Sequence, residues 1–492
     1  MSFRSMSFRS PTFCSMSFRG ALALLIVGLS VVACSAPEPA SPPNVLFIAV
    51  DDLRPQIASY GKDFMHTPNI DRLAGRGVLF ERSYVMVPTC GASRASLMSG
   101  VRPSPSRFVN YLAWAERDAP GAVTLNSQFK HNGYTTISLG KVFHHPEDNV
   151  AGWSEPPWRS KLDDYKDAAV QEAARAEHLR KFPEHTGVRR MAYEAGDADD
   201  EEYRDGETAS RAIGYLKDFS ADSEQPFFLA VGFHKPHLPF LSPQKYWDLY
   251  DIEDIDIPDN YGPPEGAPEV ALHNSGELRN YAGIPQEGPV DRETARKLIH
   301  GYYASVSFID AQIGRLLDSL DEQGLAENTI IVLWGDHGWQ LGEHGMWNKH
   351  SCFETSMHAP LIIAAPQAKG VKPGTRVSAL TEFIDIYPTL TELAGIPAPE
   401  HLEGTSAVPL MVDPSAPWKD YAVGRYRSGD TIRSDRHRYS EYADEEGDVH
   451  ARMLYDHEVD PDENVNVSEE AEKGLDVSEL TAELNQRKGR DD

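Results

Sequence analysis

Strand-like runs that end abruptly in polar side chains recur along the chain. They occupy residues 45–50, 133–141, 226–233 and 329–334, and they end in or are followed by Asp51-Asp52, Lys141 with His144, His234-Lys235 and Asp336-His337. A continuous apolar run is typical of a strand that is buried on both faces of a parallel sheet. Because ligands gather beyond the carboxyl ends of such strands, the pattern predicts one site at one edge of a sheet.

The segments between these runs predict helices and loops. Residues 295–320 repeat apolar side chains at helical spacing, which predicts a helix packed on the core, and residues 384–393 predict a second one. Residues 163–205 are highly charged, which indicates surface helices and an insertion. Residues 249–289 are rich in Pro, Asp and Gly, which favours a loop over the site.

The pattern changes near the C-terminus. Polar and apolar residues alternate over residues 421–442 and 453–456, as in antiparallel strands. We therefore predict an α/β fold in which a large, mainly parallel sheet flanked by helices forms a catalytic domain over residues 44–412. Residues 413–492 are expected to form a small C-terminal α+β subdomain.

The stretch Pro-Thr-Cys-Gly-Ala-Ser-Arg at residues 88–94 is the candidate for the reacting group. A helix is expected over residues 94–99, with Cys90 just before its N-terminus, where a developing anion is stabilised. A cysteine nucleophile usually needs a neighbouring histidine base, whereas this one has Arg94 four residues on. Taken alone, such a cysteine is more often a buried structural thiol.

Two polar groups at strand ends predict a metal site. Asp51, Asp52, Asp336 and His337 together offer three carboxylates and one imidazole. Oxygen-rich sets of this kind suit Ca²⁺ or Mg²⁺ better than zinc, which prefers thiolate and imidazole ligands.

The order of these motifs resembles the type I sulfatases, in which the cysteine becomes a formylglycine whose hydrate attacks sulfate esters. The resemblance rests on Asp51-Asp52, then Cys90-x-Ala92-x-Arg94 and residues 96–100. Residues 336–349 also resemble the corresponding sulfatase segment, and residues 140–144 and 232–237, with Trp339 and residues 100–103, look most like the iduronate-2-sulfatase branch. Ala92 replaces the proline of the commonest signature, which leaves open which maturation enzyme acts. The resemblance implies an alkaline phosphatase-like fold with a mixed sheet.

The same resemblance implies roles for the site residues. One Ca²⁺ ion would be held by Asp51, Asp52, Asp336, His337 and the modified Cys90, and Arg94 would steady the hydrate. Lys141, His234 and Lys349 would surround the sulfate, and either His234 or Lys349 would protonate the departing sugar oxygen. His144 would take a proton so that sulfate leaves and the aldehyde returns.

Further residues are candidates for binding the substrate. Trp339 and Arg102 belong to the resembling motifs, and Arg425 and Arg427 could meet a substrate carboxylate from the C-terminal subdomain. For four further histidines, the sequence leaves open whether they line the substrate pocket or have a structural role: His145, His237, His344 and His350.

The charge balance limits the classes of ligand. The formal net charge of −28 excludes generic nucleic-acid binding through a basic surface. If the substrate is sulfated, the positive groups must be gathered in one pocket.

The N-terminus reads as an export signal. Arg19 precedes an apolar run at residues 21–32 that is too short for a comfortable transmembrane helix. Residues 31–34 resemble a bacterial lipobox, so residues 1–34 are expected to be a signal peptide with Cys34 as the lipidated residue. Residues 35–43 read as a tether. The protein is expected to be attached to the bacterial cell envelope only by a lipid anchor, or to be secreted if the lipobox is not used.

The cysteine count fits this interpretation. Cys14 lies in the leader, so Cys90 and Cys352 alone remain in the mature globular part. If Cys90 becomes an aldehyde, Cys352 is expected to be a buried, inert thiol.

The sequence thus predicts an exported, calcium-dependent formylglycine sulfatase that acts on sulfated glycans. A 2-O-sulfated uronic acid at a chain end is the favoured unit, and a formylglycine-generating maturation enzyme is an expected partner. Two alternatives stay open: a phosphonate or phosphate monoester hydrolase of the same superfamily, and a non-catalytic surface glycan-binding protein.

Overall fold

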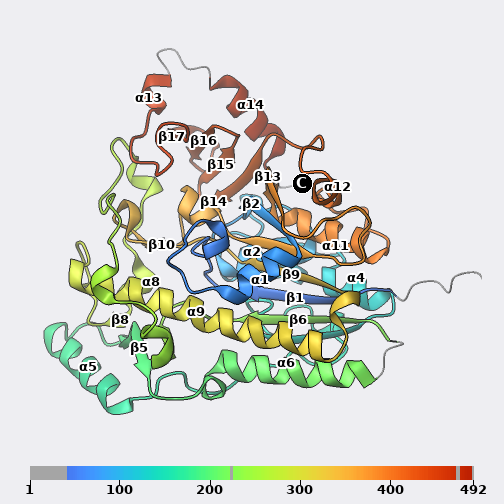
Figure 1. Ribbon diagram of the computed structural model, residues 1–492. Helices are drawn as coiled ribbons and strands as arrows, with labels where there is room; N and C mark the ends of the chain where they lie inside the picture. Colours follow the sequence, from blue (N-terminus) through green and yellow to red (C-terminus); the bar gives the residue numbers. More distant parts are fainter. Residues whose placement is uncertain (1–41, 222–224, 472–476, 490–492) are drawn as a thin grey trace, which may run out of the picture. The chain divides into compact units, whose positions relative to one another are not determined.

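A seven-stranded sheet forms the centre of the computed structural model (Figure 1). In spatial order its strands are β13 (Thr375–Glu382), β2 (Val78–Tyr84), β12 (Leu361–Ala364), β9 (Thr329–Gly335), β1 (Asn44–Val50), β6 (Phe227–Phe233) and β3 (Thr135–Gly140). Within this sheet β12 runs against its neighbours β2 and β9, and the other pairs are parallel. The predicted mixed, mainly parallel sheet is therefore confirmed.

The structure describes residues 42–221, 225–471 and 477–489. The predicted signal peptide, Cys34 and most of the tether lie outside these residues. Among the described residues, no helix is both long and apolar enough to cross a bilayer.

The central strand β1 explains how the sequence builds the two cores of the sheet. Every residue of β1 is buried, as the continuous apolar run predicts. Leu46, Ile48 and Val50 pack into one core, and the alternate residues Phe47 and Ala49 pack into the other, with Val45. Because successive side chains of a strand point to opposite faces of the sheet, one apolar run packs against the helices on both faces.

Helices cover both faces of the sheet. The first core joins β1 to α1 (Pro68–Arg76), α6 (Arg204–Ala221) and the long α9 (Arg292–Glu322). The second joins it to α2 (Cys90–Ser99), α4 (Leu125–His131) and α11 (Ile386–Ala394). The helices predicted at residues 295–320 and 384–393 are thus α9 and α11, the second preceded by a short 3₁₀ turn.

The register of the sheet sets the positions of the polar strand ends. Val50 pairs with Phe233 on one side and with Gly335 on the other. The residues that follow, Asp51, His234 and Asp336, therefore leave the sheet at the same level.

The charged and Pro-rich segments form short elements around this core. Residues 163–205 contain α5 (Ala168–Lys181) and two short strands, and residues 249–289 form a mostly irregular loop, as predicted, that includes the helical turn α8 (Gly276–Arg279). The remaining short elements are α3 (Ala115–Asp118), β4 (Arg189–Met191), β5 (Tyr193–Gly196), β7 (Phe240–Pro243), α7 (Gln244–Trp247), β8 (Tyr281–Ala282), β10 (Gln340–Leu341), β11 (Trp347–Asn348), α10 (Glu354–Met357) and α12 (Val408–Val412).

A second, antiparallel sheet follows near the C-terminus, as predicted. It consists of β14 (Ala422–Tyr426), β15 (Gly429–Arg433), β16 (His437–Ala443) and β17 (Val449–Asp456), followed by α13 (Ser468–Ala471) and α14 (Ser478–Arg487). It has a small apolar core of its own that includes Ile432, Tyr439 and Leu484. Residues 41–492 group into one compact unit, and the predicted boundary at residue 413 stays a prediction.

Candidate active site

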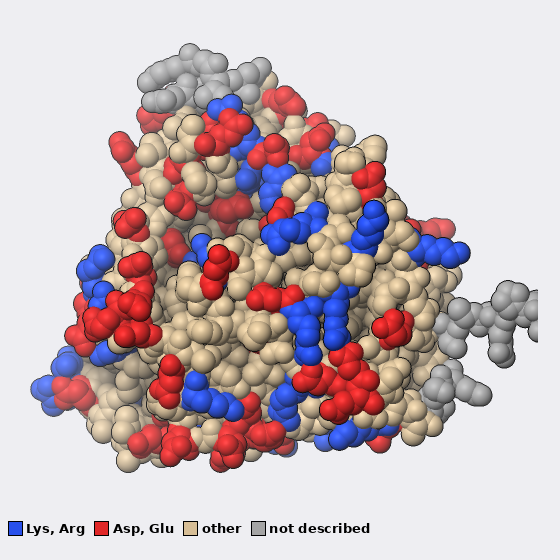
Figure 2. Space-filling view, in the orientation of Figure 1, with Lys and Arg blue, Asp and Glu red and all other residues tan. Residues whose placement is uncertain are grey.

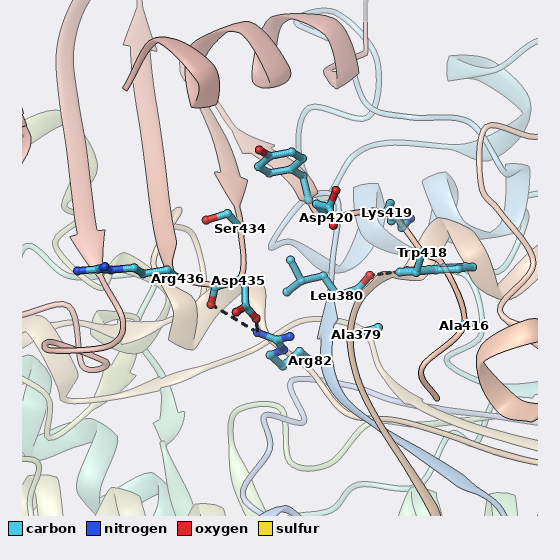
Figure 3. Close-up of a pocket in the computed structure, with 11 residues that line it drawn as sticks. Arg82, Ala379, Leu380, Ala416, Trp418, Lys419, Asp420, Ser434, Asp435 and Arg436 are labelled. Atoms are coloured by element: carbon cyan, nitrogen blue, oxygen red, sulfur yellow. Dashed lines mark hydrogen bonds and ion pairs between the residues drawn. The ribbon is translucent and has the colours of Figure 1, made fainter. Parts of the chain in front are cut away.

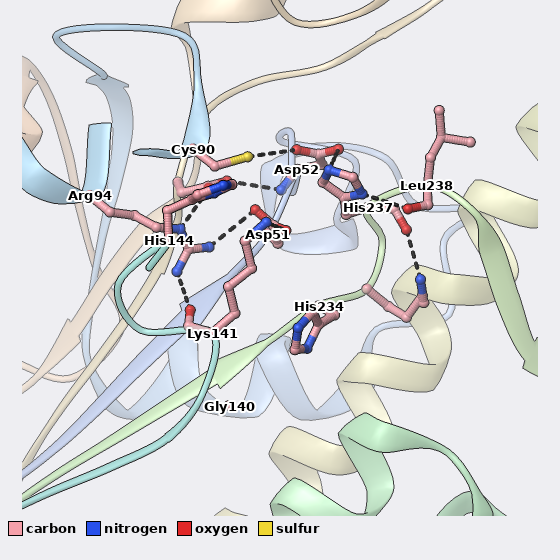
Figure 4. Close-up of polar contacts among 12 residues, drawn as sticks. Asp51, Asp52, Cys90, Arg94, Gly140, Lys141, His144, His234, His237 and Leu238 are labelled. Carbon is pink, nitrogen blue, oxygen red and sulfur yellow. Dashed lines mark hydrogen bonds and ion pairs between the residues drawn. The ribbon is translucent and has the colours of Figure 1, made fainter. Parts of the chain in front are cut away.

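Polar side chains from separate segments meet beyond the carboxyl edge of the central sheet, and Figure 4 shows several of them. Asp51 and Asp52 follow β1, Asp336 follows β9, and Lys141 follows β3. The sequence predicted this convergence from the strand-like runs. These four side chains are buried, so water screens their charges weakly and the charged groups interact strongly with each other.

Cys90 is the first residue of α2, so the helix begins four residues earlier than predicted. Its Sγ lies 3.3 Å from Nε2 of His337 and 4.0 Å from Oδ1 of Asp52. Burial, and next the charge of Asp51, raise the pKa of the Cys90 thiol to about 11. Nucleophilic cysteines have lowered pKa values, so the surroundings do not favour attack by a thiolate.

The Arg94 guanidinium joins two of the three carboxylates. Its Nε donates to Oδ2 of Asp336 at 2.8 Å, and its Nη2 donates to Oδ1 of Asp51 at 3.2 Å. Its Nη1 donates to the main-chain carbonyls of Lys141 and Val142. Arg94 is fully buried, and these bonds fix both carboxylates in place.

Asp51 is ionised because cations surround it. Its Oδ2 accepts a hydrogen bond from Nζ of Lys141. Burial alone would raise the pKa of Asp51, but Lys141, His237 and Arg94 hold this pKa well below its usual value.

Asp52 is held in a strained position at the centre of the group. Its φ of 61° lies in the left-handed region, which non-glycine residues rarely adopt. Its main-chain N donates to Oδ1 of Asp336 at 2.9 Å, and its carbonyl accepts from the Tyr302 hydroxyl at 2.8 Å. Nζ of Lys349 lies 3.2 Å from Oδ1 of Asp52. Burial raises the pKa of Asp52, against the opposing charges of His237 and Lys349.

The acceptor atoms of the site suit a divalent cation. Nδ1 of His337 lies 2.9 Å from the Gly338 carbonyl, which places the proton of a neutral ring there and the lone pair on Nε2. That Nε2 lies 3.3 Å from Oδ1 of Asp52 and 3.5 Å from Oδ1 of Asp336. A cation among these atoms would remove their mutual repulsion, and oxygen ligands favour a hard ion. One ligand atom from each of four residues lies within 4.8 Å of the others: Asp51, Cys90, Asp336 and His337.

A divalent cation bound here is expected to stabilise the protein against unfolding, because it would neutralise buried carboxylates, and calcium is the ion used in the test. An ion at a hundredfold excess over its Kd adds about 2.7 kcal/mol to the free energy of unfolding. Urea unfolding in calcium and in a chelator measures this difference. The matched variant Asp336→Asn keeps the shape of the side chain and should lose most of the calcium effect. An equal effect in both proteins would place the ion elsewhere.

His144 and His234 lie at the ends of two neighbouring strands of the site. Burial, and next the charge of Lys141, lower the pKa of His144 to about 2, so its ring is neutral. Its Nδ1 has no hydrogen-bond partner in the described structure. The main-chain N of His234 donates to Oδ1 of Asp205 at 2.8 Å, and the ring Nδ1 lies 3.5 Å from the same oxygen. Asp205 therefore orients His234.

The structure adds two groups to the predicted site. Nε2 of His237 lies 3.0 Å from Oε1 of Glu277 and 3.8 Å from Oδ2 of Asp52. The other oxygen of Glu277 lies 2.9 Å from Nζ of Lys349. The sequence had left the role of His237 open, and no motif marked Glu277. Its segment was expected to lie over the site, and α8 carries the carboxylate there.

The four predicted substrate-binding residues have other contacts here. Trp339 is fully buried, with Nζ of Lys349 4.9 Å from its ring centroid. The Arg102 guanidinium makes two hydrogen bonds of 2.7 Å to Glu382. Arg425 lies 3.4 Å from Asp430, and the Arg427 guanidinium lies over the Tyr426 ring. Their roles in substrate binding stay predictions.

The other singled-out side chains are mostly in packed positions. Cys352 is a buried free thiol, as expected. His145 stacks on the indole of Trp114, and His350 stacks on Tyr426. His344 packs on Phe353, which agrees with a structural role for this residue.

Among the described residues, charges of both signs also occur outside this site. On the face drawn in Figure 2, acidic and basic side chains alternate. A hollow of about 550 Å³ lies between β13 and the C-terminal sheet (Figure 3). Its cations are paired: Arg82 with Asp435, Lys419 with Asp385, and Arg436 with Asp456. This hollow therefore offers little net positive charge for a sulfate group.

Comparisons with known proteins agree with the geometry. The profile of the family described as Sulfatase matches residues 43–396, and the profile described as N-sulphoglucosamine sulphohydrolase, C-terminal, matches residues 342–490. Iduronate 2-sulfatase of Homo sapiens is 34% identical over 391 residues, which are 72% of this chain and 70% of that protein.

Two solved structures share the fold. One is a protein in complex with its substrate D-glucosamine-2-N,6-O-disulfate, with a TM-score of 0.71, 21% identity and coverage of 91% of this chain and 97% of that chain. The other is a phosphonate monoester hydrolase from Silicibacter pomeroyi, with a TM-score of 0.70, 22% identity and coverage of 90% and 94%.

Proposed function

This chain belongs to the sulfatase family and is a sulfuric ester hydrolase, and we propose that it removes sulfate from glycans with a formylglycine made from Cys90 beside a calcium ion. One observation supports this most strongly. The Cys90 sulfur lies 3.3 Å from His337 and 4.0 Å from Asp52, within a group of buried carboxylates at the sheet edge. The raised pKa of the thiol favours a modified residue 90 over an unmodified nucleophile.

The residues around Cys90 fit the chemistry of the two proposed cofactor groups. Asp51, Asp52, Asp336 and His337 would hold the calcium ion, with residue 90 beside it. When bound, calcium supplies a Lewis acid for a sulfate oxygen, and formylglycine supplies the nucleophilic oxygen.

The charges of the site favour an anionic ester once the ion is bound. The pKa of His237 is raised to about 10 by Asp52 and Glu277 in spite of its burial, so this ring is protonated. Four cations then face four carboxylates: Arg94, Lys141, Lys349 and His237 against Asp51, Asp52, Asp336 and Glu277. These eight charges cancel, so a bound divalent ion would give the site a net positive charge within an acidic protein.

Side chains of this chain would bind the ester and move its protons. The ammonium groups of Lys141 and Lys349 lie at the two aspartates that follow β1, close enough to turn toward sulfate oxygens. His234, oriented by Asp205, or Lys349 would protonate the departing sugar oxygen. Nδ1 of His144 has no hydrogen-bond partner in the described structure, so His144 would accept the proton whose loss expels sulfate.

The proposed substrate is a 2-O-sulfated uronic acid at the end of a glycan chain. The match to iduronate 2-sulfatase supports this unit, and the sulfated glucosamine bound by the fold neighbour supports glycans as a class. The fold neighbour that hydrolyses phosphonate monoesters makes that reaction the main competitor.

A panel of defined esters tests the proposal. We expect the highest kcat/KM on an oligosaccharide with terminal 2-O-sulfated iduronate, and at least about tenfold less on terminal 6-O-sulfated glucosamine. Ion chromatography of released sulfate measures both rates. A phenyl phosphonate monoester at equal concentration is the control. Preference for the phosphonate would overturn the proposed reaction, and preference for the 6-O-sulfate would overturn the proposed sugar.

We also propose export to the cell envelope. Support comes from the sequence of residues 1–43, in which a signal-like apolar run ends at Cys34 and a Pro-, Ala- and Ser-rich tether follows. Maturation of Cys90 would then require a formylglycine-generating enzyme that accepts Ala92 in its recognition sequence.

A further inference from the structure

A turn beside the active site exposes two neighbouring apolar side chains. Tyr111 is 53% exposed and Leu112 is 58% exposed. Single exposed apolar residues are common on protein surfaces and need no explanation. Tyr111 and Leu112 differ from such residues because they lie next to the active site and because several contacts fix their turn.

Several contacts fix the turn. The main-chain N of Leu112 donates to Oδ1 of Asn110 at 2.8 Å. The ring of Trp114 stacks on His145 with centroids 4.5 Å apart and an interplanar angle of 10°, and the Arg117 guanidinium lies 3.8 Å from the Trp114 centroid. The exposed side chains therefore stand on a rigid support.

The turn lies directly against the nucleophile helix. A Cβ atom at Gly91 would be 2.1 Å from the Tyr111 carbonyl oxygen, so the main chain of the turn touches the residue after Cys90. The Tyr111 ring centroid is 5.9 Å from that of His144, at an interplanar angle of 60°. Tyr111 thus presents an exposed aromatic ring beside a residue to which we assign a proton transfer.

We propose that Tyr111, extended by Leu112, is a platform for the sugar ring next to the one that carries the reacting sulfate. The proposal rests on the proposed function. The C–H groups on one face of a pyranose can pack on the electron-rich face of an aromatic ring. Such a contact needs no positive charge, which suits an acidic protein that binds a polyanion. A rigid tyrosine also loses little conformational entropy when it binds.

The test compares two probes that differ in this neighbouring sugar. They are 2-O-sulfated iduronic acid as a monosaccharide and a tetrasaccharide that carries the same unit at its non-reducing end. Tyr111→Ala should lower the tetrasaccharide-to-monosaccharide ratio of kcat/KM about three- to tenfold, mainly through KM for the tetrasaccharide. Tyr111→Phe keeps the ring and should keep the ratio. Phe64→Ala is the matched control, because Phe64 is 55% exposed and packs on Tyr303.

Each outcome has a distinct meaning. An unchanged ratio in Tyr111→Ala, or the same loss on both probes, would overturn the platform and leave the proposed function standing. A wild-type protein that cleaves only the monosaccharide would do the same. A wild-type protein that cleaves neither probe would overturn the proposed substrate and the platform with it.

Discussion

Replacing Cys90 with alanine is expected to lower sulfate ester hydrolysis by at least roughly 10⁴-fold, because the variant has no group from which the nucleophile can be made. The fold should persist. Cys90 is the first residue of α2, and the carboxylates around it remain held by Arg94 and Lys141. Because formylglycine carries no sulfur, the variant loses only small polar atoms at residue 90, which should cost about 1 kcal/mol in the free energy of unfolding. Hydrolysis of an aryl sulfate and urea unfolding measure the two effects.

Cys352→Ala is the matched control for this variant. Both cysteines are buried free thiols, and Cys352 packs with Phe353, Tyr442 and Met453 away from the carboxylates. Its loss should cost a similar amount of stability and leave turnover near that of the wild type. Substantial activity in Cys90→Ala, or equal loss of activity in both variants, would contradict the role of residue 90.

The second large effect is expected in Arg94→Met. The substitution keeps an unbranched side chain but leaves Asp51 and Asp336 without the buried guanidinium that holds both. Breaking a buried ion pair by removing one partner costs about 3–5 kcal/mol in the free energy of unfolding. Urea unfolding in the presence of a chelator measures this cost, since a bound cation would partly replace the lost charge.

Arg436→Met provides the comparison for a paired but exposed arginine. Arg436 binds Asp456 from a side chain that is 48% exposed, so its loss should change stability far less than the loss of Arg94. Arg94→Lys should fall between Arg94→Met and the wild type, because it restores the charge without the fork of donors. Equal stability of Arg94→Met and the wild type would show that the carboxylates do not depend on Arg94.

The sequence predicted the site edge well because the signal is local. Each of the long buried strands β1, β6 and β9 is a continuous apolar run, and the residue after each strand is a candidate site residue. Parallel pairing then brings Asp51, His234 and Asp336 to the same level without further information. The C-terminal strands were also visible as local alternation.

Other parts of the site depend on long-range packing that no local pattern encodes. Glu277 reaches Lys349 and His237 from a single helical turn in an otherwise irregular segment. Arg102 meets Glu382, 280 residues further along the chain. The start of α2 was missed because its first turn has small side chains without apolar periodicity, although Thr89 stands where capping residues are common.

The same limit applies to the exposed turn. Tyr111 and Leu112 carry no sequence motif, and only the fold shows that their main chain touches Gly91. The substrate platform is therefore an inference from the structure, whereas the nucleophile and the carboxylates could be named from the sequence.

The mass of the tryptic peptide 83–94, from protein produced in its native host, tests the central claim most directly. The account predicts a peptide lighter than the unmodified one by the difference between a thiol-bearing and an aldehyde side chain, in protein that releases sulfate. An active protein whose peptide carries an intact Cys90 thiol throughout would contradict it.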